Sequence, residues 1–165
     1  MTLTDGSADL ALVLRPATTA DADAVADIHL GARRAAPMPP GIHPDHEVRE
    51  WLRGRLASDE VWLALVEDEP AGYARLADDW LDDLYVLPEH AGRGIGSALL
   101  GVAKARCPAG FGLWVFEVNE PARTFYRRHG LVEVERTDGA DNEEKAPDIR
   151  MEWQPGLSVR PATMA

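Results

Sequence analysis

Cysteine is nearly absent from this chain of 165 residues, with Cys107 as the single example. An internal disulfide is therefore excluded, and we expect a cytoplasmic location, where thiols stay reduced. Long apolar runs are also lacking, and the opening MTLTDGSADLALVLRP has no basic region followed by a long apolar stretch. We therefore expect neither a membrane partner nor a secretory signal.

Basic residues are few. The chain has 17 basic and 28 acidic side chains, giving a net charge of −11. This balance argues against nucleic acid and anionic membranes as partners and suits a cationic substrate. The apolar share of 45% and the length are those of one compact domain with a core of its own.

Glycine, in contrast, is concentrated in one place. The stretch LYVLPEHAGRGIGSALL, residues 84–100, takes a short apolar strand through Gly92, Gly94 and Gly96 into a helix. Glycines let backbone amides approach a ligand closely, and a helix start adds unpaired N–H groups and a positive dipole end. The pattern predicts a cradle for an anion, most naturally a pyrophosphate.

Other readings of this loop differ in spacing. No Gly-Lys-Ser/Thr ends it, which argues against a nucleoside triphosphatase loop. A dinucleotide fingerprint needs Gly-x-Gly-x-x-Gly, and here the third glycine comes one residue early, although Glu117 lies about where a ribose-binding acid would stand. We expect no dinucleotide domain, because the fewer than fifty residues after Glu117 are too few for its repeated strand-helix units. A plain flexible turn between strand and helix remains the alternative for the loop taken alone.

Hydrophobic periodicity outlines the remaining elements. Predicted strands cover residues 12–15, 61–66, 72–77, 81–87, 113–118, 131–136 and 149–153. Predicted helices lie within 18–36, with Thr19 as the capping candidate, and at 47–57, 95–106 and 120–129. The proline-rich residues 37–46 predict a stiff extended loop. This order predicts a mixed α/β domain with a largely antiparallel first half and a strand-helix-strand crossover at the glycines.

The predicted domain covers residues 12–153, after a flexible segment 1–11. In the tail 154–165, LSVRPATMA matches LVLRPATTA of residues 12–20 at six of nine positions. A duplicated domain start and a coincidence both stay open.

A second motif, NEPARTFYRRHGL at residues 119–131, follows the glycine loop. Together the two stretches resemble the signature motifs of the GNAT superfamily of acyl-CoA-dependent N-acyltransferases, and the element order agrees. The resemblance implies an α+β fold whose mostly antiparallel sheet of six to seven strands splays at a cofactor slot, flanked by about four helices. It also implies acetyl-CoA as co-substrate and no metal.

The resemblance assigns the slot residue by residue. Backbone groups of Leu84 and Val86 would pair with the pantetheine arm, amides of residues 92–97 would hold the pyrophosphate, and Asn119 would bind through its side chain. The cofactor-binding residues implied are Leu84, Tyr85, Val86, Gly92, Arg93, Gly94, Ile95, Gly96, Ser97, Asn119 and Tyr126. One departure is Ala91, where the family usually has Gln or Arg. Arg93 is a candidate replacement for that charge.

The chemistry of acyl transfer suggests roles for several residues. Tyr126, two turns after the N-cap candidate Asn119, is the predicted general acid for the leaving thiolate, and the Val86 N–H is the predicted carbonyl polariser. Asp82, Asp83 and Glu117 are candidate bases, with a water chain as the alternative. Because Asp82 and Asp83 are adjacent on a strand, we expect them to face opposite sides of the sheet.

Trp80 and Trp114, with the acidic loop from Asp141 to Glu144, are candidates for the wall of an acceptor pocket. His43 and His46 are expected to flank its opening rather than bind a metal. The predicted activity is N-acetyl transfer to a primary amine of a small molecule or peptide. A non-catalytic acyl-CoA-binding module is the alternative, and monomer and homodimer both remain open.

Overall fold

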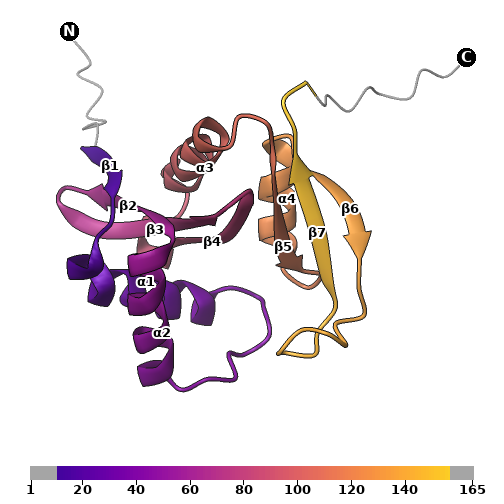
Figure 1. Cartoon of the computed structure of the whole chain (residues 1–165), viewed down its shortest axis with the longest axis horizontal. Coiled ribbons are helices and arrows are strands. Elements are labelled where there is room, and N and C mark those ends of the chain that lie inside the picture. Colours follow the sequence, from indigo (N-terminus) through magenta and orange to yellow (C-terminus); the bar gives the residue numbers. More distant parts are fainter. Residues whose placement is uncertain (1–10, 157–165) are drawn as a thin grey trace, which may run out of the picture.

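The computed structural model describes residues 11–156. Within them, one seven-stranded sheet is flanked by four α-helices (Figure 1). In chain order the elements are β1 (Leu12–Pro16), the 3₁₀ turn η1 (Thr19–Asp21), α1 (Ala22–Ala35), α2 (Asp45–Ser58), β2 (Glu60–Val66), β3 (Glu69–Ala77), β4 (Trp80–Val86), the 3₁₀ turn η2 (Pro88–His90), α3 (Ile95–Arg106), β5 (Phe111–Phe116), α4 (Glu120–Arg128), β6 (Val132–Arg136) and β7 (Asp148–Trp153). The predicted fold class is confirmed.

The sheet runs in the order β1-β2-β3-β4-β5-β7-β6. Every neighbouring pair is antiparallel except β4 and β5, which are parallel. These two strands share a single paired position, Trp80 with Gly112. The sheet therefore consists of two leaves, β1–β4 and β5-β7-β6, which separate beyond that position (Figure 1).

Both faces of the first leaf are covered. On β2, Val61 and Leu63 are buried under α1 and α2, while Ala64 and Val66 belong to the core under α3. Figure 1 shows α1 and α2 on one side of β2–β4 and α3 on the other. Each fully buried Leu or Val contributes about 1.5 to 3 kcal/mol to the free energy of unfolding. The first leaf is therefore a stable support for β4 and the glycine loop that follows it.

The second leaf has one apolar and one polar face. Leu113 and Met151 pack into the main core, and Tyr126 and Leu131 join them from α4 and the turn after it. The opposite face carries charged pairs such as Arg150 with Glu135. Such an alternation is usual where only one face of an antiparallel sheet is covered.

β4 contains an irregularity at Asp82. Arg75 of β3 pairs with Asp83 and Leu76 pairs with Leu81, so Asp82 is an extra residue without a partner on β3. Such a bulge breaks the alternation of side chains. Both aspartates consequently reach the same guanidinium, that of Arg75. The expectation that they face opposite sides of the sheet is wrong for this reason.

Most predicted boundaries agree with the structure to within two or three residues. The exceptions have local causes. The turn between β2 and β3 is only Glu67 and Asp68, both at positive φ, so β3 begins three residues early. The helical stretch before α1 begins with η1, whose N-cap is Thr18 rather than Thr19, and the Thr18 amide donates to Asp21. The tail repeat from residue 157 onward lies outside the described residues.

None of the helices among residues 11–156 combines the length and the apolarity that crossing a bilayer requires.

Candidate active site

The glycine loop between β4 and α3 exposes its main chain. Gly92 and Gly94 adopt the left-handed conformation, with φ of +76° and +78°, and open space surrounds the position of a Cβ at each. The first helical hydrogen bond of α3 runs from the Ala98 amide to Gly94. Within residues 11–156 no acceptor pairs with the amides of residues 92–97. Six consecutive free amides at a helix start form a site for an anion.

The third glycine, Gly96, lies in the first turn of α3 and faces α4. A Cβ there would lie 3.4 Å from the ring of Phe125, which is an ordinary van der Waals contact, so the packing of the two helices does not itself require glycine. Ser97, one residue later, donates its hydroxyl to His129 Nε2 at 2.9 Å, since His129 Nδ1 bonds the Phe125 carbonyl. Ser97 would thus reach an anion through its amide.

Arg93 is exposed, and within the described part of the chain it forms no ion pair. Its guanidinium is free to meet a negative charge at the loop. The structure is therefore compatible with Arg93 replacing the charge missing at Ala91, which stays a prediction.

The slot beside this loop results from the divergence of β4 and β5. Leu84, Tyr85 and Val86 pair with Ala74, Tyr73 and Gly72 of β3 on one side of β4. On the other side, the pairing with β5 has already ended at Trp80. The edge of β4 is thus available to an extended ligand, as in the addition of a strand to a sheet.

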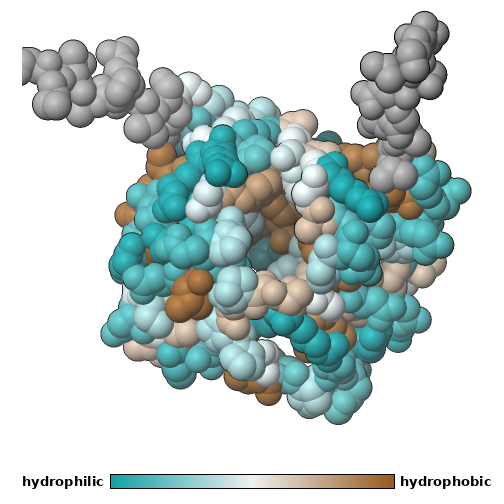
Figure 2. All heavy atoms as spheres, turned by 180° about the vertical axis from the view of Figure 1, so that it is seen from behind, coloured by the Kyte–Doolittle hydropathy of each residue, from teal (hydrophilic) through white to brown (hydrophobic). Residues whose placement is uncertain are grey.

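A cavity of about 1140 Å³ occupies the space between the leaves. It is enclosed by the end of α1, residues 36–43, α2, β4, β5, the start of α4 and residues 143–144 of the β6–β7 loop. Seen from behind, the molecule is hollowed near its centre, with apolar atoms deep in the recess (Figure 2). A cavity of this size accommodates a small acceptor together with the end of a cofactor arm.

Tyr126 and Asn119 of the second motif both border this cavity. The Asn119 side chain caps α4 by accepting from the Ala122 amide at 3.4 Å. Tyr126 is 9% exposed, and its hydroxyl has no hydrogen-bond partner within residues 11–156. Burial raises the pKa of Tyr126 well above its usual value, and the nearby Tyr85 and Asp83 raise it further. Its phenol is therefore a proton donor over the whole neutral range.

The three candidate bases have unequal positions. Asp83 is buried and accepts from Tyr73 at 3.0 Å and from Arg75 Nε at 2.7 Å. Asp82 is 37% exposed, lies 3.4 Å from Arg75 NH1, and has its pKa raised, first of all by burial. Both border the cavity, whereas Glu117 pairs with Arg136 and is not part of its wall.

The acceptor side includes one of the two predicted tryptophans. Trp114 borders the cavity from β5. Trp80 does not, because it packs against Gly112 at the position where the two leaves are paired. A Cβ on Gly112 would lie 2.9 Å from the Trp80 ring. Trp51 of α2 borders the cavity instead and stacks on Arg75 with its ring centre 4.8 Å from the guanidinium carbon.

Two ion pairs join the loops that border the cavity. Arg33 of α1 meets Glu144 at 2.9 Å, and His43 meets Glu143 at 3.0 Å. Arg33 also donates to the carbonyl of Pro39 at 3.4 Å. The proline-rich loop and the β6–β7 loop are thus tied together at the cavity. The predicted position of His43 at the opening agrees with this, whereas His46 does not border the cavity.

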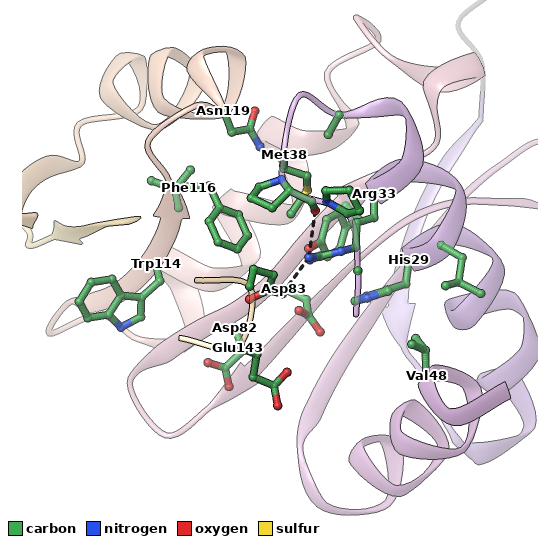
Figure 3. A pocket seen from close by; sticks show the side chains of 18 of the residues that line it. His29, Arg33, Met38, Val48, Asp82, Asp83, Trp114, Phe116, Asn119 and Glu143 are labelled. Carbon is green, nitrogen blue, oxygen red and sulfur yellow. Dashed lines mark hydrogen bonds and ion pairs between the residues drawn. The ribbon is translucent and has the colours of Figure 1, made fainter. Parts of the chain in front are cut away.

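Sequence reasoning missed two polar residues, His29 and Tyr73. His29 lies on the buried side of α1 and borders the cavity (Figure 3). Tyr73 is fully buried on β3. In Figure 3, His29 faces the cavity from one side, Trp114 and Phe116 from the other, and Asp83 lies between them. The available signal was a histidine at a core position of an amphipathic helix.

No group of three or more His, Cys, Asp or Glu in the described part of the chain is arranged to hold a metal ion.

Comparison with known proteins defines the family. The model of the Acetyltransferase (GNAT) family matches residues 25–131, which is more than half of the chain. The chain therefore belongs to the GNAT acetyltransferase family.

Individual relatives agree. Over 96 residues the chain is 31% identical to the peptidyl-lysine N-acetyltransferase YjaB of Salmonella typhimurium, covering 58% of this chain and 66% of that protein. The chain spans about half to two thirds of the length of the curated relatives that it matches.

Two solved structures share the fold. Apo YjaB of Escherichia coli superposes with a TM-score of 0.71 at 22% identity, covering 87% of this chain and 98% of that one. YncA of Salmonella typhimurium with its cofactor acetyl-CoA superposes with a TM-score of 0.68 at 19% identity, covering 93% and 99%. At these identities the likeness concerns the fold.

Proposed function

We propose that the chain transfers an acetyl group from acetyl-CoA to a primary amine while both substrates are bound. The observation that carries the proposal is the arrangement of three groups. The free amides of residues 92–97 follow the edge of β4 at Leu84 to Val86 along the chain, and Leu84 borders the same cavity as Tyr126.

The residues present fit acetyl-CoA. The amides at the start of α3 would hold the pyrophosphate, the edge of β4 would pair with the pantetheine amides, and Asn119 borders the same slot. Acetyl-CoA supplies an activated thioester at the end of this arm. The N–H of Val86 would polarise the thioester carbonyl as the amine adds to it.

Tyr126 would then protonate the departing sulfur. An ordinary thiol has a pKa near 8.5, below that of a phenol. The burial that raises the pKa of Tyr126 would also raise the pKa of a thiol beside it, and this favours protonation of the departing thiolate.

The acceptor would be cationic. Asp45, Glu47, Asp82 and Glu143 all border the cavity, so it attracts an ammonium group. The relative named as a peptidyl-lysine N-acetyltransferase supports a lysine-bearing peptide as one candidate class. A small aliphatic amine is the other.

Thiol release from acetyl-CoA across a panel of amines and lysine peptides tests the proposal. We expect release that depends on the acceptor, and a fall in kcat of about 100-fold in Tyr126→Phe. Calorimetry should give the same affinity for coenzyme A in both proteins, because the phenol acts after binding.

A non-catalytic acyl-CoA-binding module is the second candidate, and Ala91 is the residue that favours it. Binding of coenzyme A without acceptor-dependent release, across the whole panel, would replace the enzyme by the module. Failure to bind either coenzyme A or acetyl-CoA would remove both.

A further inference from the structure

A chain of hydrogen bonds leads from Asp83, in the buried polar cluster between β3 and β4, to a histidine on the cavity wall. Asp83 accepts from the Tyr73 hydroxyl at 3.0 Å, and that hydroxyl lies 2.7 Å from His29 Nδ1. His29 and Asp83 are each 8% exposed, and Tyr73 is fully buried. The geometry of all three side chains is therefore fixed by packing.

These hydrogen bonds determine which atom carries each proton. Asp83 also receives Arg75 Nε at 2.7 Å, so it is an ion-paired carboxylate that can only accept. Tyr73 must then use its one proton to donate to Asp83. His29 Nδ1 must in turn be the donor to the Tyr73 oxygen. A neutral imidazole that carries its proton on Nδ1 has a lone pair on Nε2.

That lone pair is accessible. Within residues 11–156 no side chain or backbone group bonds His29 Nε2. The polar atoms there that are both fully buried and unpaired are Arg55 Nε and His90 Nδ1, so His29 Nε2 retains contact with the cavity that His29 borders. The ring packs edge-on against Tyr85 with ring centres 4.9 Å apart. Tyr85 lies between Leu84 and Val86, where the thioester is expected.

We propose that His29 Nε2 accepts the proton of the acceptor ammonium, with Tyr73 and Asp83 as the residues that position it. This rests on the proposed acetyl transfer. The ammonium has three N–H bonds and the product amide has one. One proton passes to His29 Nε2 before the N–C bond forms and then leaves to solvent. The second leaves the nitrogen as the C–S bond breaks and ends on the thiol, through Tyr126.

The charges around His29 suit this role. Burial lowers the pKa of His29 below its ordinary 6.5, Asp83 on β4 raises it, and Arg33 on α1 and Arg75 on β3 lower it, with a net lowering. Tyr73 and Tyr85 face the ring as neutral phenols. The imidazole is thus neutral and able to accept at neutral pH, and Asp83 stabilises the imidazolium across Tyr73.

Asp83 is less suited to accept the proton itself. Its Oδ2 already accepts hydrogen bonds from the Tyr73 hydroxyl and the Arg75 guanidinium. Asp82 also lies beside Arg75. His29 is the group on this wall with a free lone pair and no cation in contact.

The experiment compares His29→Gln with His46→Gln, a matched change at an exposed α2 position outside the cavity. We expect His29→Gln to lower kcat about 100-fold with an alkylamine near pH 7 and to remove the fall of kcat/KM at acidic pH. The loss should largely disappear with an amine of low pKa that is already unprotonated at that pH. His46→Gln should match the native protein in all of these measurements.

A purely structural role would give a different pattern. An unchanged acidic limb in His29→Gln, or an equal loss with both amines, would overturn the proposal while leaving acetyl transfer intact. Absence of turnover in the native protein would instead overturn the proposed function, and this inference with it.

A measurement on the native protein covers the case in which His29→Gln does not fold. Nitrogen-15 NMR should show the Nδ1–H tautomer of His29 and a pKa below 6.5 that coincides with the acidic limb in turnover. The Nε2–H tautomer, or a titration unrelated to that limb, would also overturn the proposal.

Discussion

The two sides of the cavity differ in the kind of group that they present. The proposed cofactor side consists of main-chain atoms, the free amides of residues 92–97 and the edge of β4. The acceptor side consists of side chains, including Arg33, His43 and Trp51, from segments far apart in the sequence. Main-chain donors are the same in any sequence that folds this way, whereas side chains are particular to one chain. The proposed assignment agrees with this difference, since it gives the chain a cofactor that its family shares and an acceptor of its own.

The largest effect should come from breaking the polar cluster on the acceptor side. Asp83→Asn removes the buried carboxylate that accepts from Arg75 Nε and Tyr73. We expect a loss of about 3 kcal/mol in the free energy of unfolding, because one partner of a buried ion pair is removed. Denaturant titration measures it.

The neighbour provides the control. Asp82→Asn should change the free energy of unfolding by less than about 1 kcal/mol, since Asp82 is half-exposed. The fold raises the pKa of Asp82, so the contribution of this group to the free energy of unfolding falls as pH rises through that pKa. Equal effects of the two changes would contradict the difference in burial.

On the cofactor side, Gly94→Ala should weaken binding of coenzyme A about tenfold, since a left-handed conformation costs an alanine about 1 to 2 kcal/mol. Calorimetry with coenzyme A measures the change. Gly101→Ala is the control, at an exposed α3 position with open space and an ordinary φ. The acceptor KM should stay the same in both, and a change confined to that KM would reverse the assignment of the two sides.

Trp114→Ala should affect the acceptor alone. Trp114 is 46% exposed and borders the cavity, so its removal should raise the acceptor KM about fivefold with little change in stability. Trp80→Ala should behave in the opposite way and lower the unfolding temperature, because Trp80 packs on Gly112. Steady-state kinetics and thermal unfolding separate the two, and a KM effect of Trp80→Ala alone would contradict the cavity wall described above.

The smallest effect concerns the pH dependence of the contact between His43 and Glu143 at the opening of the cavity. Glu143 and Glu47 raise the pKa of His43. The contact is thus fully formed below the ordinary histidine pKa of about 6.5 and is lost as pH rises through the raised value. The acceptor KM should change by about twofold across that range in the native protein and stay flat in His43→Gln. An acceptor KM that does not change with pH in either protein would show that the contact between His43 and Glu143 has no part in acceptor binding.

The fold was largely predictable from local patterns. Hydrophobic periodicity placed α3 at its observed bounds, and Asn119 caps α4 as its residue type predicts. The exposed glycine loop was predictable because the close spacing of its glycines is visible in the sequence.

The acceptor side was less predictable for a physical reason. The bulge at Asp82 is a matter of pairing with β3, and nothing in the aspartates themselves indicates it. The contact of His29 with Tyr73 joins residues 44 positions apart, so no short motif contains it. Trp80 was expected at the cavity wall and Trp51 is found there instead, because tertiary packing, rather than residue type, decides which aromatic ring borders a cavity.

Because β4 and β5 share a single paired position, the sheet is nearly divided into two leaves. The extended arm of the proposed cofactor, bound between the leaves, would act as an added strand and supply backbone pairing that the protein lacks there. A ligand present at 100 times its dissociation constant adds about 2.7 kcal/mol to the free energy of unfolding. The concentration of the proposed cofactor would in this way determine how stably the two leaves are held together. The acceptor would then bind to a more rigid protein when acetyl-CoA is abundant.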